Sequence, residues 1–346
     1  MAAREVQAGR TRRFNEVHID DPDFYNEVYT KHTAARPIDR LEKYKHRFGR
    51  PEALVSTVDG ETHRIRRAAV APFFSNTRIS TLGDTPQEVI ENTSHGLSTE
   101  YAGTGKVINL AFARRTRFSD APEFQSPYTQ AMMSWVFASH LTTHFNFMIQ
   151  TMHWMSDASV GRLLPSLKPL LDYRQVRDVL AGKNMDAKDA SHATIFHDIL
   201  RSDLPPKELT ELRLTQEAMS VSGAGVETTM WTLSVITFHV LWNPAIDPDC
   251  TRRVRSRPVA AQPARPDGKH PLASYLVSFT RGSRVCIGQH LVMMDMYVAL
   301  ATLFRRHKLQ LFETDRSDED FQVDLVRPMP KWESKGVIII VKDQRL

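Results

Sequence analysis

The longest helical pattern in the chain runs from Glu208 to about Trp242. Prolines stand at its start, where they are tolerated because the first N–H groups of a helix lack intrahelical partners. A helix of about 35 residues would be about 52 Å long, so it would cross a whole domain. Gly223 and Gly225 lie inside it, and each interior glycine costs about 1 kcal/mol relative to alanine. Close approach of a flat ligand to the backbone would explain these glycines, and so would simple helix packing.

One of the two cysteines, Cys286, stands in the loop Phe-Thr-Arg-Gly-Ser-Arg-Val-Cys-Ile-Gly, which spans residues 279–288. An apolar helical stretch from Leu291 to Phe304 follows the loop. A cysteine near a cation, here Arg284, and near a helix N-terminus is biased toward the thiolate that ligates metals. For a lone cysteine, burial in a core is the commoner role. The order of the loop residues is therefore needed to distinguish a metal-ligating cysteine from a cysteine buried in a core.

That order, Phe-x-x-Gly-x-Arg-x-Cys-x-Gly, resembles the haem-binding loop of cytochromes P450, and every fixed position is matched. In that family a cysteine thiolate is the axial ligand of the haem iron. The resemblance implies that Cys286 is the metal ligand and that Arg284 pairs with a haem propionate. It further implies that Phe279 packs beside the cysteine and shields the sulfur, and that Gly282 is the glycine of the haem-binding loop.

The middle of the long helix reads Ser-Gly-Ala-Gly-Val-Glu-Thr-Thr from Ser222. An acid next to an alcohol could pass protons in an apolar site. The segment resembles the helix I signature of cytochromes P450, Ala/Gly-Gly-x-Asp/Glu-Thr-Thr/Ser. The resemblance implies that Ala224 and Gly225 widen a groove for O₂ and that Glu227 and Thr228 deliver protons. This signature precedes the cysteine loop, as in the family.

His63 and Arg67 are four residues apart in a helical pattern over residues 63–75, so they share one face. Two donors on one face can clamp a carboxylate. A solvated basic face is the alternative, because arginine is usually exposed. The pattern resembles helix C of cytochromes P450, in which an aromatic residue or histidine and an arginine contact the haem propionates. The implied cofactor is haem b, held in part by His63 and Arg67.

The 346 residues suffice for one large core, and we predict a single cytochrome P450-like domain over residues 1–346, mainly α with a small β part. Residues 245–270 are rich in arginine and proline and are predicted to be irregular or disordered. The helix K pair of the family, Glu-x-x-Arg, is absent between the two signatures. It occurs only at Glu61–Arg64 and Glu313–Arg316. The predicted P450 fold is therefore internally shortened and incomplete.

The composition indicates which partners and which cellular compartment would suit the protein. A net charge of +5 with 41% hydrophobic residues is ordinary for a soluble globular protein and does not point to nucleic acid. The positive net charge would suit binding to an acidic redox partner or to an anionic lipid. Two cysteines make no disulfide framework, which favours a reducing compartment. The polar N-terminal stretch lacks an apolar run, so we expect no membrane anchor in this chain and a cytoplasmic location or peripheral contact with the endoplasmic reticulum.

The resemblance implies a haem-thiolate monooxygenase that inserts one oxygen atom from O₂ into an apolar secondary metabolite, a terpenoid or polyketide. The sequence of the chain resembles fungal enzymes of secondary metabolism, such as trichothecene-pathway oxygenases. Electrons would come from NADPH through a cytochrome P450 reductase. Residues 127–155, rich in Met, Phe and Trp, would roof the substrate pocket or form core. The alternative is a non-catalytic P450 remnant without a working haem site, and a plain helical interaction protein would leave both signatures unexplained.

Overall fold

The computed structural model describes residues 8–13, 16–19, 21–31, 33, 36–46, 48–80, 84–109, 195–243, 272–324 and 328–344, with a few single positions between 139 and 163. The predicted irregular segment at 245–270 lies outside these residues. So does most of the apolar stretch at 127–155.

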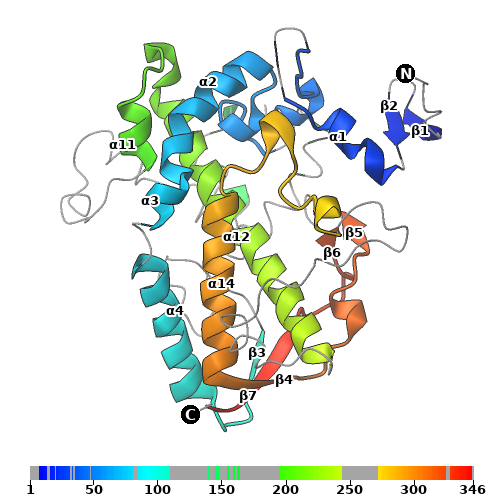
Figure 1. Ribbon diagram of the computed structural model, residues 1–346, viewed down its shortest axis with the longest axis vertical. Coiled ribbons are helices and arrows are strands. Elements are labelled where there is room, and N and C mark those ends of the chain that lie inside the picture. Colours follow the sequence, from blue (N-terminus) through cyan, green and yellow to red (C-terminus); the bar gives the residue numbers. More distant parts are fainter. Residues whose placement is uncertain are drawn as a thin grey trace.

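Helix α12 (Glu211–Trp242) is the long helix that the sequence predicts, with 32 residues and a length of about 48 Å. It begins three residues later than predicted, because the prolines form a separate 3₁₀ turn, Pro206–Glu208. The side chain of Thr210 then caps α12 by accepting a hydrogen bond from the backbone N–H of Arg213. Helix α14 (Gln289–Arg306) lies beside α12 through the centre of the molecule (Figure 1).

Shorter helices surround this central pair (Figure 1). Helix α4 (Asp84–Gly96) lies along α14, and α2 (Gly60–Val70) contacts α11 (Ile195–Leu200). Two more short α-helices in the described part of the chain are α1 (Tyr25–Val28) and α3 (Asn76–Ser80).

Among the residues that the structure describes, apolar side chains form three buried clusters along α12 and α14. The first holds Leu214 and Ala218 of α12 with Leu291 at the start of α14. The second, midway, holds Leu233 with Met296 and Ala299. The third lies at the far end and holds Phe238, Leu303, Phe304, Ile339 and Val341. The two helices therefore pack against common apolar clusters at several positions along their length. Burial of these side chains is the main force that holds the helices together.

The β part is small. Strands β3 (Val107–Asn109), β7 (Ile338–Gln344) and β4 (His307–Leu311) form an antiparallel sheet in the order β3-β7-β4. Two further pairs are β1 (Ala8–Arg13) with β2 (Glu16–Ile19) and β5 (Val323–Asp324) with β6 (Pro328–Met329). The predicted strands near 309–312 and 336–341 are β4 and β7. The predicted fold class, mainly α with a small β part, is confirmed.

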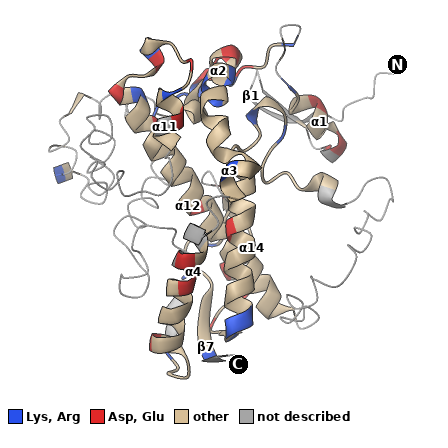
Figure 2. Cartoon of the chain, turned by 60° about the vertical axis from the view of Figure 1, so that its left-hand side comes forward, with Lys and Arg blue, Asp and Glu red and all other residues tan. Residues whose placement is uncertain are grey.

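Charged residues gather at the end of the molecule that holds α1 and α2, while the middle of α12 and of α14 is mostly uncharged (Figure 2). Within the described ranges, no helix combines the length and the apolar character needed to cross a bilayer.

Candidate functional site

The cysteine loop is shaped by its own backbone bonds. Thr280 has a positive φ of 56°, and its side chain donates a hydrogen bond to the carbonyl of Arg284 (3.0 Å). The N–H of Cys286 donates to the carbonyl of Phe279 (2.8 Å). These bonds close the loop and leave Cys286 exposed, three residues before α14 begins. The ring of Phe279 packs on the cluster of Leu233 and Met296.

Gly282 lies where the loop meets the segment that contains α1. Its φ is +67°, and a Cβ there would stand only 2.2 Å from the carbonyl oxygen of Thr30. The next residue, Ser283, donates its N–H to that same oxygen (3.3 Å). Arg281 also donates to the side chain of Asn26 and lies over the ring of Tyr25. A glycine is therefore required at position 282, because any side chain would displace the loop from this support.

Helix α2 presents the predicted pair His63 and Arg67. The side chain of Asp59 caps the helix by accepting from the N–H of Thr62 (2.7 Å). His63 is only 5% exposed, whereas Arg67 is partly exposed. Burial lowers the pKa of Arg67, and the charge of Cys286 acts in the opposite direction, so these two side chains lie within electrostatic range. The structure thus brings α2 and the cysteine loop together.

Several cations surround His63. Burial, and after it the charges of nearby arginines, lower its pKa from 6.5 to about 3; these arginines are Arg284, Arg67, Arg40 and Arg66. Arg284 itself, with a pKa lowered to about 10 mainly by burial, stays protonated at neutral pH. A neutral histidine among guanidinium groups is an arrangement that favours an anion with several oxygens. These residues therefore fit the carboxylates of a haem, beside a free thiol that fits its iron.

The position of His63 predicts a pH dependence of stability. Between about pH 6.5 and pH 3 the unfolded histidine binds a proton that the folded one does not. The free energy of unfolding should therefore fall as the pH is lowered through this range, by up to about 1.4 kcal/mol per unit. We expect His63→Gln to lose this component in urea unfolding of the haem-free chain between about pH 7 and pH 5. Equal slopes for the two proteins would contradict the prediction.

On α12, Ala224 and Thr228 are both exposed, one helical turn apart. The hydroxyl of Thr228 donates to the carbonyl of Ala224 (2.7 Å). Gly225 is partly buried, and Glu227 is only 4% exposed. The two predicted proton-carrying residues are neighbours in sequence but lie on different faces of the helix, one exposed and one buried.

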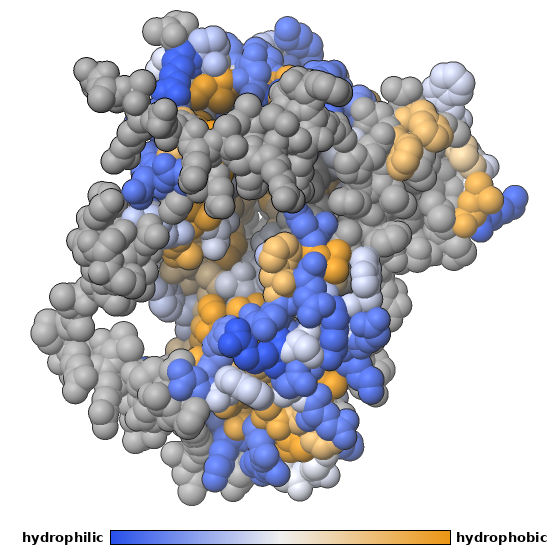
Figure 3. All heavy atoms as spheres, turned by 90° about the vertical axis from the view of Figure 1, so that its right-hand side faces the viewer, coloured by the Kyte–Doolittle hydropathy of each residue, from blue (hydrophilic) through white to orange (hydrophobic). Residues whose placement is uncertain are grey.

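The turn of α12 from Ala224 to Thr228, exposed on one side, lies between two residues that share apolar clusters with the cysteine loop. Val221 belongs to the same apolar cluster as Ile287, and Leu233 belongs to the same cluster as Phe279. The segment from Ala224 to Thr228 falls between these two points. On the face drawn in Figure 3, hydrophobic side chains gather in a hollow between the upper and lower parts of the molecule.

The structure also shows polar contacts that no motif in the sequence indicates. Thr57 and Val58 accept hydrogen bonds from Arg284 through their carbonyl oxygens (2.7 and 2.9 Å). Backbone acceptors carry no sequence signal. Arg66, next to the predicted Arg67, is 8% exposed and forms an ion pair with Glu208 (2.7 Å). Its burial follows from the helical period that also buries His63 and Val70.

Comparison with known proteins places these features in a family. Residues 262–335, which include the cysteine loop, match the family model described as Cytochrome P450. The chain is 31% identical over 432 residues to cytochrome P450 monooxygenase orf6 of Eupenicillium brefeldianum, covering 95% of this chain and 85% of that protein. It is 28% identical to cytochrome P450 monooxygenase MO6277 of Ascocoryne sarcoides, covering 97% and 87%. An aligned span of 432 residues exceeds the 346 of this chain, so that relative contains residues without a counterpart here.

The fold agrees with this relationship. The solved structure of the cytochrome P450DA haem domain superimposes with a TM-score of 0.60 at 14% identity. The match covers 95% of this chain and 88% of that one. The narrower resemblance to trichothecene-pathway oxygenases stays a prediction. The chain belongs to the cytochrome P450 family of monooxygenases.

Proposed function

We propose that this chain binds haem b through Cys286 and acts as a monooxygenase on an apolar secondary metabolite, a terpenoid or polyketide. The observation that supports this most is that three features are linked through the cysteine loop, by nearby charges and by shared apolar clusters. The three features are the exposed thiol of the cysteine loop, the cations around His63, and the exposed turn of α12 between Ala224 and Thr228. When bound, the haem would supply the activation of O₂ and the transfer of one oxygen atom.

The residues of the chain would then have separate tasks. Cys286 would ligate the iron, while Arg67, Arg284 and His63 would hold the propionates. The hydroxyl of Thr228 would hold a proton on the exposed face of α12. Glu227, buried in the same helical turn, would replenish that proton through water. Phe279 and Gly282 would keep the cysteine loop in place, and Ala224 and Gly225 would leave room above it.

Electrons would come from NADPH through a cytochrome P450 reductase. We infer its docking area from the charged end of the molecule that holds α1 and α2 (Figure 2). The side chain of Arg64 is 62% exposed there and forms an ion pair with Glu61 (2.6 Å), with which an acidic partner would compete. We further propose that residues 1–346 form one domain.

The carbon monoxide difference spectrum of the dithionite-reduced, purified protein tests this proposal. We expect a Soret band at the red-shifted position of thiolate-ligated haem. Well-folded protein without haem absorbance would overturn the proposal and favour the alternative, a non-catalytic remnant of the family. Absorbance without the red-shifted band would show haem bound by a ligand other than a thiolate.

A further inference from the structure

Thr57 connects the buried Arg66 to the partly buried Arg284, which comes from a different part of the chain. Its hydroxyl accepts a hydrogen bond from Nη1 of Arg66 on α2 (2.9 Å). Its carbonyl accepts one from Nη1 of Arg284 in the cysteine loop (2.7 Å). Thr57 is 6% exposed, so both bonds are shielded from water. The place of its backbone therefore affects where Arg284, two residues before the cysteine, can lie.

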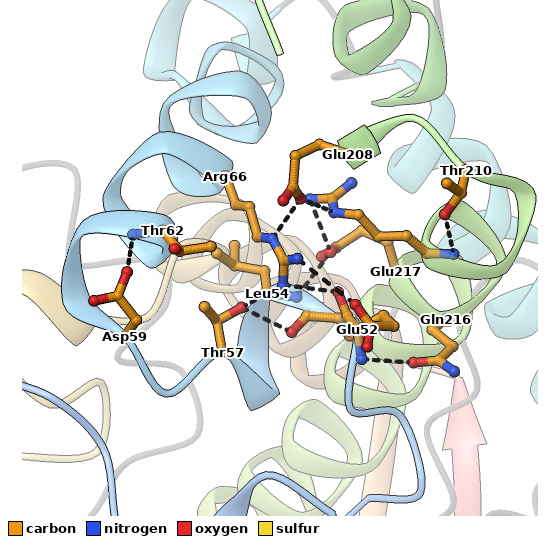
Figure 4. Close-up of polar contacts among 12 residues, drawn as sticks. Glu52, Leu54, Thr57, Asp59, Thr62, Arg66, Glu208, Thr210, Gln216 and Glu217 are labelled. Carbon is orange, nitrogen blue, oxygen red and sulfur yellow. Dashed lines mark hydrogen bonds and ion pairs between the residues drawn. The ribbon is translucent and has the colours of Figure 1, made fainter. Parts of the chain in front are cut away.

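Arg66 is itself fixed by a buried ion cluster, drawn in Figure 4. Its Nε donates to Glu208 (2.7 Å), whose same oxygen lies 3.0 Å from Nε of Arg213. Arg213 in turn lies 3.7 Å from Glu217, whose carboxylate accepts the N–H of Leu54 (2.9 Å). Arg213 and Glu217 are 1% and 2% exposed. Charges this deeply buried keep their partners because separation would leave one of them unpaired.

The loop that carries Thr57 is attached to α12 at two more points. The N–H of Glu52 donates to the side chain of Gln216 (2.8 Å), and Arg50 donates to the carbonyl of Met219 (3.0 Å). Residues 50–57 are thus held against the first turns of α12. The ion cluster fixes α2 to the same region.

We propose that the contacts Arg284–Thr57–Arg66–Glu208, here called the Thr57 bridge, position the cysteine loop relative to α12. This inference rests on the proposed function, because the position of the loop affects activity only if its cysteine thiolate binds the haem iron. In this chain the family's Glu-x-x-Arg pair is absent between α12 and the cysteine loop. The Thr57 bridge fixes the loop from the α2 side, while Thr30 and Asn26 support its other side.

Thr57→Val tests the bridge, because it keeps the shape of the side chain and replaces the hydroxyl with a methyl group. The acceptor of the Arg66 bond is then lost, together with the bond that the hydroxyl donates to the carbonyl of Ala53 (3.1 Å). Thr57→Ser keeps the hydroxyl and should behave like the natural chain. The first measurement is hydrogen exchange of the haem-free protein, followed at the amides of Val285 and Cys286. We expect Thr57→Val to speed this exchange about tenfold, the effect of losing one buried hydrogen-bond partner. The second measurement is the fraction of haem that shows the red-shifted band, which should fall in Thr57→Val alone.

Ser94→Ala is the matched control. It removes a buried hydrogen bond of similar kind, between the Ser94 hydroxyl and Nε2 of His307 (2.9 Å). That bond lies at the far end of α14, an 18-residue helix about 27 Å long. Ser94→Ala should lower the unfolding midpoint without faster exchange at Cys286.

The two proposals fail in different ways. Exchange at Cys286 that is unchanged in Thr57→Val, or that rises equally in Ser94→Ala, would overturn the Thr57 bridge as a positioning device. Absence of a red-shifted band in the natural chain would overturn the proposed function. The exchange measurement would still decide on the bridge, because it uses the haem-free protein.

Discussion

Replacing Cys286 with alanine should abolish the red-shifted Soret band of the carbon monoxide complex and leave the fold intact. The side chain is exposed, so its loss removes little packing. The bond from the residue 286 N–H to the carbonyl of Phe279 belongs to the backbone and survives the substitution. We therefore expect the free energy of unfolding to change by no more than about 0.5 kcal/mol. The loss of the band should be complete, because no other residue of the loop supplies a thiolate.

Cys250→Ala is the control for this experiment, since Cys250 is the other thiol of the chain. It should retain the band. Retention of the band in Cys286→Ala would contradict the assignment of the ligand. Loss of the band in both variants would point to a general effect on folding, which circular dichroism and the unfolding midpoint of each variant would reveal.

The features that the sequence predicts well are those set by local pattern. The long helix α12, the helix α14 after the cysteine and the strands β4 and β7 follow from apolar periodicity. The pattern predicts the start of α12 at Glu208, three residues before its start at Glu211, because residues 206–208 form a 3₁₀ turn and Thr210 caps the helix. Propensity alone does not distinguish a 3₁₀ turn from the first turn of an α-helix.

The sequence predicts candidate site residues only where they lie together in one continuous segment of the chain. The cysteine loop and the turn of α12 are continuous segments, so a resemblance could propose roles for their residues, and these roles stay predictions. The ion cluster was not predictable, because Arg66 and Glu208 are 142 positions apart in sequence. The spacing Glu61–Arg64 even offered a false match to Glu-x-x-Arg. In the structure that pair is a surface ion pair at 2.6 Å, with side chains 52% and 62% exposed.

The second large effect should come from Arg213. Substitution with methionine keeps much of the volume but leaves Glu208 and Glu217 without the cation between them. Removing one partner of a buried ion pair is destabilising by about 3–5 kcal/mol. Urea unfolding of the haem-free chain should therefore show a loss of this size for Arg213→Met. Arg64→Met, which breaks the exposed pair with Glu61, should lose no more than about 1 kcal/mol.

The loss in Arg213→Met should also depend on pH in a defined direction. Burial raises the pKa of Glu217 above its ordinary 4.5, while Arg213 lowers it. Without the arginine the folded chain holds the Glu217 proton more tightly than the unfolded chain does. The destabilisation caused by Arg213→Met should therefore shrink as the pH falls toward the raised pKa of Glu217. It should grow as the pH rises above that pKa. Glu217→Gln combined with Arg213→Met should recover part of the loss, since the amide oxygen can still accept the N–H of Leu54. A loss that is constant with pH and unaffected by Glu217→Gln would mean that Arg213 stabilises the fold by packing rather than by its charge.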